Sequence, residues 1–169
     1  MSYAIYAEFA QKANKLMKNG LNRRVFNTIE AQSGTDIALH PDGSITLEPG
    51  TYRISGVSTV TMQATLAPPV IDFNNVYVGY AMVYPTSAEN LGMDTLKRAI
   101  AISTPSTAAY FAPAVFDAVY TTKETETIAV GHQAGNELNK EVYLSIYDVG
   151  GTTSEYHAVA RVAITRIDR

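Results

Sequence analysis

Apolar and polar residues alternate along most of the chain after residue 24. Val25, Asn27, Ile29 and Ala31 alternate with more polar neighbours, which is the two-residue period of a β-strand. The same period recurs in short segments separated by Gly, Pro, Asp and Ser. We therefore expect strands over residues 25–31, 37–39, 45–47, 51–61, 76–84, 99–103, 110–119, 125–133, 141–149 and 156–167.

Turn signals lie between these segments. The break His40-Pro41-Asp42-Gly43-Ser44 contains Asp-Gly, a strong hairpin signal because glycine adopts the positive φ that the turn requires. In residues 51–61 the apolar phase slips at Ser55-Gly56, which predicts a β-bulge. Residues 66–70 contain Pro68-Pro69, and residues 85–95 are polar and irregular, so both segments are predicted loops.

The segment VYVGYAMVY, residues 76–84, is apolar in both phases of the alternation. It therefore predicts a central strand that is covered on both faces. Eight to ten short strands, turn signals about every ten residues and no alternating helices favour an antiparallel sandwich or barrel over a parallel sheet. The fold class we expect is all-β.

A helix is predicted only near the N-terminus. Ile5, Phe9, Ala13, Leu16 and Met17 recur at three- and four-residue spacing, and Gly20 stands where such a helix would end. We therefore expect a helical arm over residues 1–22 and a β-sandwich over residues 23–169. The short helix either folds against the domain or packs against sister chains.

Several short motifs resemble the tumour-necrosis-factor/complement globular-head jelly roll. Gly43–Val60, GSITLEPGTYRISGVSTV, is similar to its early strands, in which a Pro-Gly turn precedes Tyr-x-Ile. Gln133–Asn136 followed by Val142–Ile146 is similar to its later turn and apolar strand, although Asn136 replaces the usual acidic residue. Arg161–Ile167 is similar to its final strand.

This resemblance implies a ten-stranded jelly roll that forms a compact homotrimer, with tyrosines and aliphatic residues along the threefold axis. Comparable modules occur in adhesins, spore-surface filaments, bacterial lectins and phage tail proteins. The chain has 11 Tyr and no Trp, and tyrosines in register with aliphatic residues favour core or interface packing over a ligand platform. The interface residues that we expect are Tyr77, Tyr80, Tyr143, Val162 and Ile164.

Composition and charge limit the kinds of binding partner and the cell compartments that the sequence favours. A net charge of −3 and a pI near 5.6 provide no field that attracts nucleic acid. The basic positions Lys12, Lys15, Lys18, Arg23 and Arg24 are interpreted as a solvated helix face rather than a site for an anionic partner. The absence of cysteine excludes disulfides and thiol chemistry. We recognise no signal peptide and no run of about 20 apolar residues, which predicts a soluble protein without membrane insertion. The sequence does not fix its location, and a virion or cell surface reached by a non-classical route is one that fits.

The sequence contains no recognisable cluster of catalytic residues. His40, His132 and His157 are too far apart in the sequence for a local metal motif, and no Gly-x-Ser-x-Gly elbow occurs. Residues 150–153, GGTT, are interpreted as a hairpin loop rather than a phosphate cradle. Calcium ligands from Asp72, Asn74 and Asn75, or from Asp148, are less expected than solvated turns. We therefore predict no catalytic residues, no metal site and no cofactor.

These observations favour a non-enzymatic homotrimeric assembly or binding module, a surface, adhesin or phage structural component, whose loops contact a protein or glycan receptor. The alternative is a carbohydrate-binding module, or lectin. It is suggested by hydroxyls and amides in the loops at residues 85–95, 104–107 and 150–154. An enzyme on a β scaffold is the least favoured class.

Overall fold

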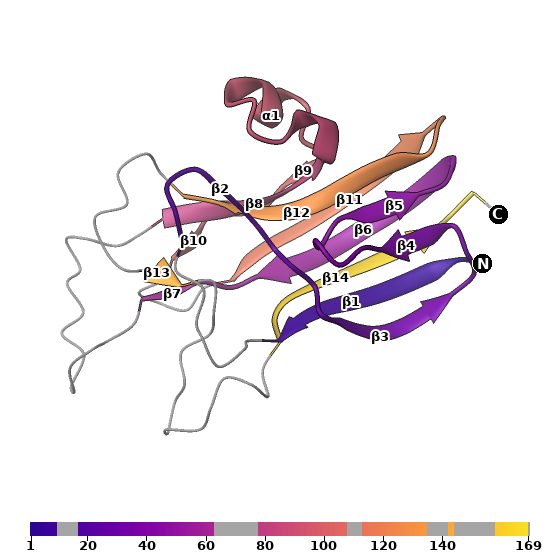
Figure 1. Cartoon of the computed structure of the whole chain (residues 1–169), viewed down its shortest axis with the longest axis horizontal. Coiled ribbons are helices and arrows are strands. Elements are labelled where there is room, and N and C mark those ends of the chain that lie inside the picture. The colour runs from indigo at the N-terminus through magenta and orange to yellow at the C-terminus, as the bar shows by residue number, and fades with distance from the viewer. Residues whose placement is uncertain (10–16, 63–77, 108–112, 135–141, 144–157, 169) are drawn as a thin grey trace.

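Two antiparallel sheets face each other and form a sandwich in the computed structural model (Figure 1). The structure describes residues 1–9, 17–62, 78–107, 113–134, 142–143 and 158–168. One sheet has five strands in the order β11-β6-β14-β1-β3, and the other contains β10-β8-β12-β5-β4, with β2 paired to β12 and β9 paired to β8. A small third sheet pairs β13 with β7. The all-β jelly-roll sandwich predicted from the sequence is confirmed.

The strands follow most of the expected segments. They are β1 (Tyr3–Phe9), β2 (Leu21–Arg23), β3 (Thr28–Ser33), β4 (Ile37–Leu39), β5 (Ile45–Leu47), β6 (Gly50–Ser58), β7 (Thr61–Met62), β8 (Val78–Pro85), β9 (Ala101–Ile102), β10 (Ser106–Thr107), β11 (Ala114–Thr122), β12 (Glu126–Gln133), β13 (Val142–Tyr143) and β14 (Ala158–Arg166). Two short helical segments, η2 (Thr86–Ala88) and α1 (Met93–Lys97), occupy the predicted loop after β8.

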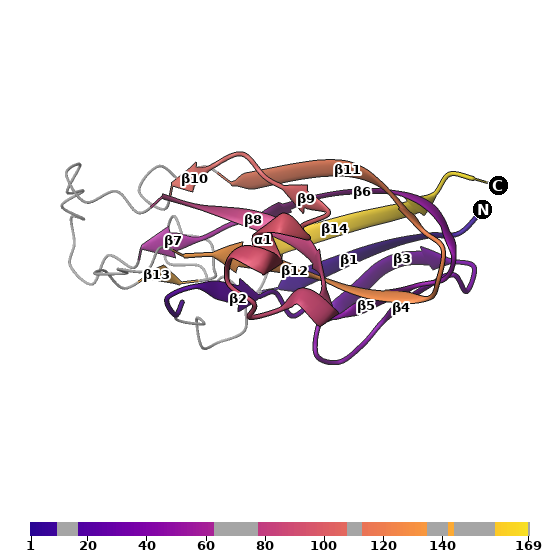
Figure 2. The same ribbon diagram turned by 90° about the horizontal axis from the view of Figure 1, so that it is seen from above.

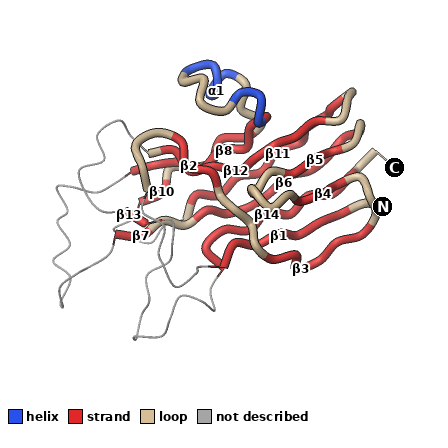
Figure 3. Tube along the Cα trace, viewed as in Figure 1, coloured by secondary structure: helices blue, strands red, loops and turns tan. Residues whose placement is uncertain are grey.

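The predicted N-terminal helix is wrong over Tyr3–Phe9, which form strand β1 between β14 and β3 (Figure 3). Ala4 and Tyr6 point into the core, whereas Ile5 lies on the opposite side of the pleat. Because apolar residues occupy both sides of this strand, their spacing imitated that of a helix. Residues 10–16 lie outside the described residues, and the boundary after residue 22 stays a prediction.

Strand β6 contains no bulge at Ser55-Gly56. Its pairing with β11 and with β14 runs through these residues without a shift in register. Gly56 faces the sandwich interior, where the ring of Phe116 fills the space that a side chain would need. Val57 lies on the outward side of the same strand, which explains why the apolar phase changes there.

The main core lies between the two sheets. Its largest fully buried apolar side chains include Tyr6, Tyr52, Ile54, Ile128 and Ile164, contributed by both sheets. A second cluster forms on the other side of β8 and β12, where Met82, Tyr84 and Ala129 pack with Leu96 of α1 (Figure 2). Strand β8 is therefore covered on both faces over Ala81–Tyr84, as its apolar pattern predicted.

Candidate functional site

The outward face of the five-stranded sheet presents residues from all five strands in rows. One row runs across the strands from β11 to β3 through Asp117, Ser55, Ala163, Ile5 and Ala31. Four of these five side chains are short or aliphatic, and all except Asp117 are half-buried in the single chain. This central row is a flat strip that a second molecule is able to approach closely. We call this side of the sheet the outward face.

Apolar side chains flank the central row. The next row along the strands contains Val119 on β11 and Tyr3 on β1. The side chain of Val119 is 65% exposed and that of Tyr3 is 40% exposed. Val115, on the other side of the central row, is 49% exposed. Exposed apolar residues that gather on one sheet face are typical of a contact surface, whereas scattered ones need no explanation.

Two ion pairs bridge neighbouring or nearby strands on the same face. Arg161 Nε lies 2.7 Å from Glu30 Oε2, and Arg53 Nε lies 3.1 Å from Asp117 Oδ1. The Arg161 guanidinium lowers the pKa of Glu30, chiefly by hydrogen bonding. Exposed pairs of this kind stabilise a chain little, but they place polar groups at defined points around an apolar strip.

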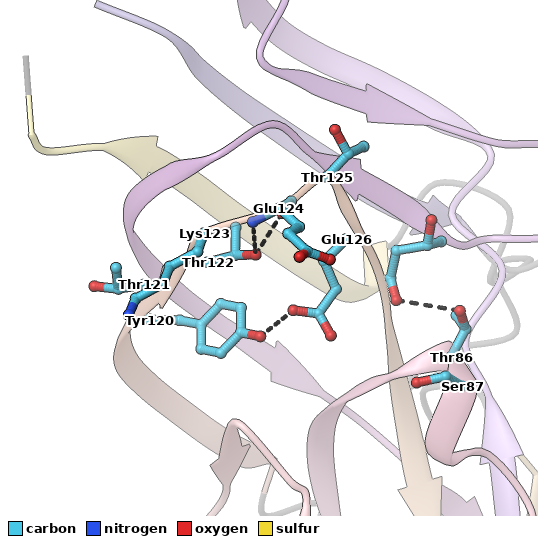
Figure 4. Close-up of a pocket in the computed structure, with 10 residues that line it drawn as sticks. Thr86, Ser87, Tyr120, Thr121, Thr122, Lys123, Glu124, Thr125 and Glu126 are labelled. Atoms are coloured by element: carbon cyan, nitrogen blue, oxygen red, sulfur yellow. Dashed lines mark hydrogen bonds between the residues drawn. The ribbon is translucent and has the colours of Figure 1, made fainter.

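A polar pocket lies between the β11–β12 hairpin and η2 (Figure 4). Its volume is about 540 Å³, and the lining consists of Thr86, Ser87 and residues 120–127. Thr122 is buried, Tyr120, Glu126, Thr127 and Thr86 are half-buried, and the other lining residues are exposed. The pocket therefore has a hydroxyl- and carboxylate-bearing floor and an exposed rim.

Hydrogen bonds fix the pocket floor. The hydroxyl of Tyr120 on β11 donates to Oε2 of Glu126 on β12, and Thr86 Oγ1 donates to the Thr127 carbonyl at 3.1 Å. Burial, and then the hydrogen bond to the Glu126 carboxylate, raise the pKa of Tyr120 to about 12. The phenol therefore stays protonated near neutral pH and keeps the carboxylate in place.

An ion-pair network holds η2 beside the pocket. The Arg23 guanidinium binds both carboxylate oxygens of Glu89, which follows η2, and lies 2.7 Å from Asp42. Tyr84 donates its hydroxyl to Glu89 at 2.8 Å. The Arg23 guanidinium lowers the pKa of Glu89. Arg23, predicted to lie on a solvated helix face, instead anchors the segment that forms one wall of the pocket.

A polar cluster is buried between the two sheets. Arg24 and His132 are 0% exposed, and both contact Ser58: Arg24 Nε donates to Ser58 Oγ at 2.9 Å, and His132 Nδ1 lies 2.8 Å from that oxygen. Ser106 Oγ lies 3.1 Å from His132 Nε2, and Glu8 Oε2 lies 3.6 Å from the Arg24 guanidinium. The prediction of a solvated face is thus also wrong for Arg24.

The sequence patterns missed this cluster, although one signal pointed to it. His132 shares the two-residue phase of Ile128 and Val130, whose side chains lie in the core. That phase predicts an inward histidine, which must then be hydrogen-bonded. Arg24 carries no comparable signal, because it lies between β2 and β3 rather than within a strand.

The structure describes the side chains of three of the five predicted interface residues, and the interface as a set stays a prediction. Val162 and Ile164 are 0% exposed in the core of a single chain, so neither side chain lies at the surface. Tyr80 is half-buried against the cluster under α1. Tyr143 lies in β13, of which only the backbone is described, and Tyr77 lies outside the described residues.

The described residues provide neither a cluster of metal ligands nor a helix that could span a membrane. Across the part of the chain that the structure describes, no three His, Asp or Glu side chains are grouped so that they could hold a metal ion. The calcium candidates Asp72, Asn74, Asn75 and Asp148 lie outside that part, as does His157. The helices within it are too short or too polar to span a membrane.

Solved structures with similar folds include two of murine APRIL. One, at pH 8.0, has a TM-score of 0.55 at 9% sequence identity, and the other, at pH 5.0, has a TM-score of 0.53 at 7% identity. Each comparison covers 98% of both chains. The globular domain of zebrafish complement 1qA protein matches with a TM-score of 0.45 at 12% identity. No protein-family model and no curated protein sequence matches the chain. The resemblance to the tumour-necrosis-factor-like jelly roll is confirmed at the level of the fold.

Proposed function

We propose that this chain is a non-enzymatic assembly module that forms a homotrimer through the outward face of its five-stranded sheet. The observation that carries this proposal is the set of exposed apolar side chains, Tyr3, Val115 and Val119, beside the central row of short side chains. Covering such a face removes apolar area from water without changing the fold of the chain.

Short side chains in the central row favour close packing between copies. Ser55 and Ala163 are direct neighbours across β6 and β14, and neither side chain has more than two heavy atoms. A partner surface therefore comes within van der Waals distance over the middle of the face. The Arg161–Glu30 pair lies beside this strip and the Arg53–Asp117 pair lies at its β11 end, where charges at defined positions favour one orientation of the partner.

The trimeric state is supported by the resemblance of the fold rather than by a contact within the single chain. Tumour-necrosis-factor-like jelly rolls are trimers, and this chain resembles them in its overall fold of two facing sheets. A closed ring of three copies covers an apolar face that a single chain leaves in water. We extend the proposal to a surface, adhesin or phage structural component that binds a protein receptor, on the same resemblance.

Sedimentation equilibrium at micromolar concentration tests this function. The expected mass is three times the 18.3 kDa of one chain. Ala163→Asp places a charge in the central row and is expected to yield a folded monomer. Ile102→Asp is the matched control, because Ile102 is 51% exposed on the other sheet, so this variant should stay trimeric. A monomeric unmodified chain, or equal behaviour of the two variants, contradicts the proposal.

Carbohydrate binding remains the alternative function. The outward face gives it no support, because four of the five side chains in its central row are short or aliphatic. It requires a separate surface on which hydroxyl and carboxylate groups converge.

A further inference from the structure

We infer that the pocket between the β11–β12 hairpin and η2 is a binding site for a small neutral polyhydroxylated ligand, a mono- or disaccharide. This inference goes beyond assembly and does not depend on it, because one chain supplies the whole lining. The volume of about 540 Å³ lies within the roughly 300–1,000 Å³ of small-molecule sites.

Hydroxyl groups dominate the lining. Six of its ten side chains are Ser or Thr: Thr86, Ser87, Thr121, Thr122, Thr125 and Thr127. A Ser or Thr hydroxyl both donates and accepts, so it suits a ligand whose own hydroxyls do the same. Four of these residues belong to the β11–β12 hairpin, and the other two, Thr86 and Ser87, belong to η2 (Figure 4). Thr86 and Thr127 lie on facing sides, whereas the hydroxyls of Thr121 and Thr125 hydrogen-bond Thr51 and Glu48 outside the lining.

Glu126 is the strongest acceptor in the floor. Tyr120 occupies its Oε2, and among the described residues no other group hydrogen-bonds this carboxylate. Oε1 is therefore available to accept from a ligand hydroxyl. Hydrogen bonds to an ionised acceptor are about twice as strong as those between neutral groups, so this oxygen is the expected anchor.

The rest of the lining is already in place before a ligand arrives. Thr86 is bonded to the Thr127 carbonyl, and Ser87 accepts a hydrogen bond from Arg98 at 2.9 Å. Thr125 donates to Glu48 at 2.9 Å. These bonds hold the hydroxyl oxygens in position while leaving lone pairs that accept from a ligand, so little ordering is required on binding.

The charge of the lining selects against anions. Lys123 contributes one positive charge, whereas Glu124 and Glu126 contribute two negative charges. An acidic sugar, such as a sialylated glycan, would bring a further carboxylate towards Glu126. A neutral sugar meets no such repulsion, and the Lys123 ammonium is able to donate to its hydroxyls.

The test is a titration of the unmodified chain with methyl glycosides of glucose, galactose, mannose and fucose, followed through its backbone amide NMR signals. We expect shifts concentrated at residues 86–87 and 120–127 with at least one glycoside. Methyl sialoside should cause smaller shifts at the same concentration. No shift with any of the four glycosides, shifts located elsewhere, or a preference for methyl sialoside would each overturn the inference.

Glu126→Gln then tests the anchor. This variant keeps the shape of the side chain but weakens its acceptor, and we expect the Kd of the bound glycoside to rise about tenfold or more. Asp94→Asn is the matched control, because Asp94 lies on α1 and pairs with Lys97 outside the pocket lining. Equal affinity of Glu126→Gln and the unmodified chain rules out Glu126 as the anchor.

Repeating the titration with Ala163→Asp separates the two proposals. Binding that persists in a monomeric Ala163→Asp chain supports the pocket independently of assembly. Loss of binding in that variant, with its fold intact, places the site at a subunit contact and overturns the assignment to a single chain.

Discussion

Ser58 Oγ and His132 Nδ1 lie 2.8 Å apart and connect the two sheets of the sandwich through the core. Ser106 Oγ donates its one proton to the Gly79 carbonyl, so it accepts from His132 Nε2. In the neutral imidazole Nδ1 is then the acceptor, and the Ser58 hydroxyl, which accepts from Arg24 Nε, donates to it. The cluster is a directed chain of hydrogen bonds around a neutral imidazole.

Replacing Ser58 by alanine should destabilise the chain. The variant leaves Arg24 Nε and His132 Nδ1 without this partner in the core, and a buried unsatisfied polar group costs about 1–3 kcal/mol. Urea unfolding measures the loss. Ser87→Ala serves as the control, since Ser87 is exposed and its removal should change the free energy of unfolding by no more than about 0.5 kcal/mol. Equal effects would mean that Ser58 contributes no buried link.

Stability should fall as the pH drops below 6.5. Burial, and then the Arg24 charge, lower the pKa of His132 from 6.5 to about 3. Between these values the unfolded chain binds the proton and the folded chain does not, so folding loses stability as pH falls through this window. At pH 5 the loss from His132 is about 2 kcal/mol relative to pH 7.

His132→Gln isolates this effect. Glutamine does not titrate, so the difference in unfolding free energy between pH 7 and pH 5 should shrink by about the same 2 kcal/mol. The lowered pKa values of carboxylates such as Glu30 and Asp42 remove stability at lower pH than this interval. An unchanged difference in His132→Gln would show that the imidazole is protonated in the folded chain.

Glu8→Gln should be more damaging than the loss of a surface carboxylate. Arg24 is fully buried, and Glu8, whose side chain is 12% exposed, lies 3.6 Å from its guanidinium. Removing one partner of a buried ion pair typically costs about 3–5 kcal/mol, because the other charge stays in the core. Asp94→Asn breaks the exposed Asp94–Lys97 pair and should cost about 0.5 kcal/mol or less. Chemical unfolding of both variants compares the two losses.

Gly56→Ala should destabilise the sandwich even though it adds a single methyl group. A Cβ at this position would lie 2.5 Å from the Phe116 ring and would also meet the Arg161 carbonyl of the neighbouring strand. Overpacking of a core costs about 1–3 kcal/mol. Ser55→Ala, on the outward side of the same strand, is the control for thermal unfolding and should leave the Tm nearly unchanged. A similar Tm for both variants would contradict the close packing at Gly56.

Adjacent residues of β14 should respond in opposite ways to the same charge. Val162 is 0% exposed, whereas Ala163 lies on the outward face. Val162→Asp buries an unpaired carboxylate and should abolish folding, while Ala163→Asp should retain the β-sheet circular dichroism spectrum of the unmodified chain. Soluble, folded protein from both variants would mean that the side chain of Val162 does not lie in the core.

Local patterns in the sequence were enough to predict the fold class and most strands. The alternation around Ile45, Ile54 and Ile164 repeats every two residues whatever lies across the sheet, so it is readable without the partner strand. The same locality explains the failure at Tyr3–Phe9. Apolar residues on both sides of β1 reflect a core on one side and the outward face on the other, and only the complete sheet distinguishes these two environments.

The pocket and the buried cluster depend on register between segments that are far apart in the chain. Glu8, Arg24, Ser58 and His132 meet because β1, β6 and β12 lie in two sheets that face each other. No period or motif links them, since the partner of a polar side chain across a sandwich is set by which strands pair and how they stack. The sequence alone therefore determined that this protein is a β-sandwich. Tertiary structure decided which of its polar residues are buried, and which of its apolar residues are left at the surface.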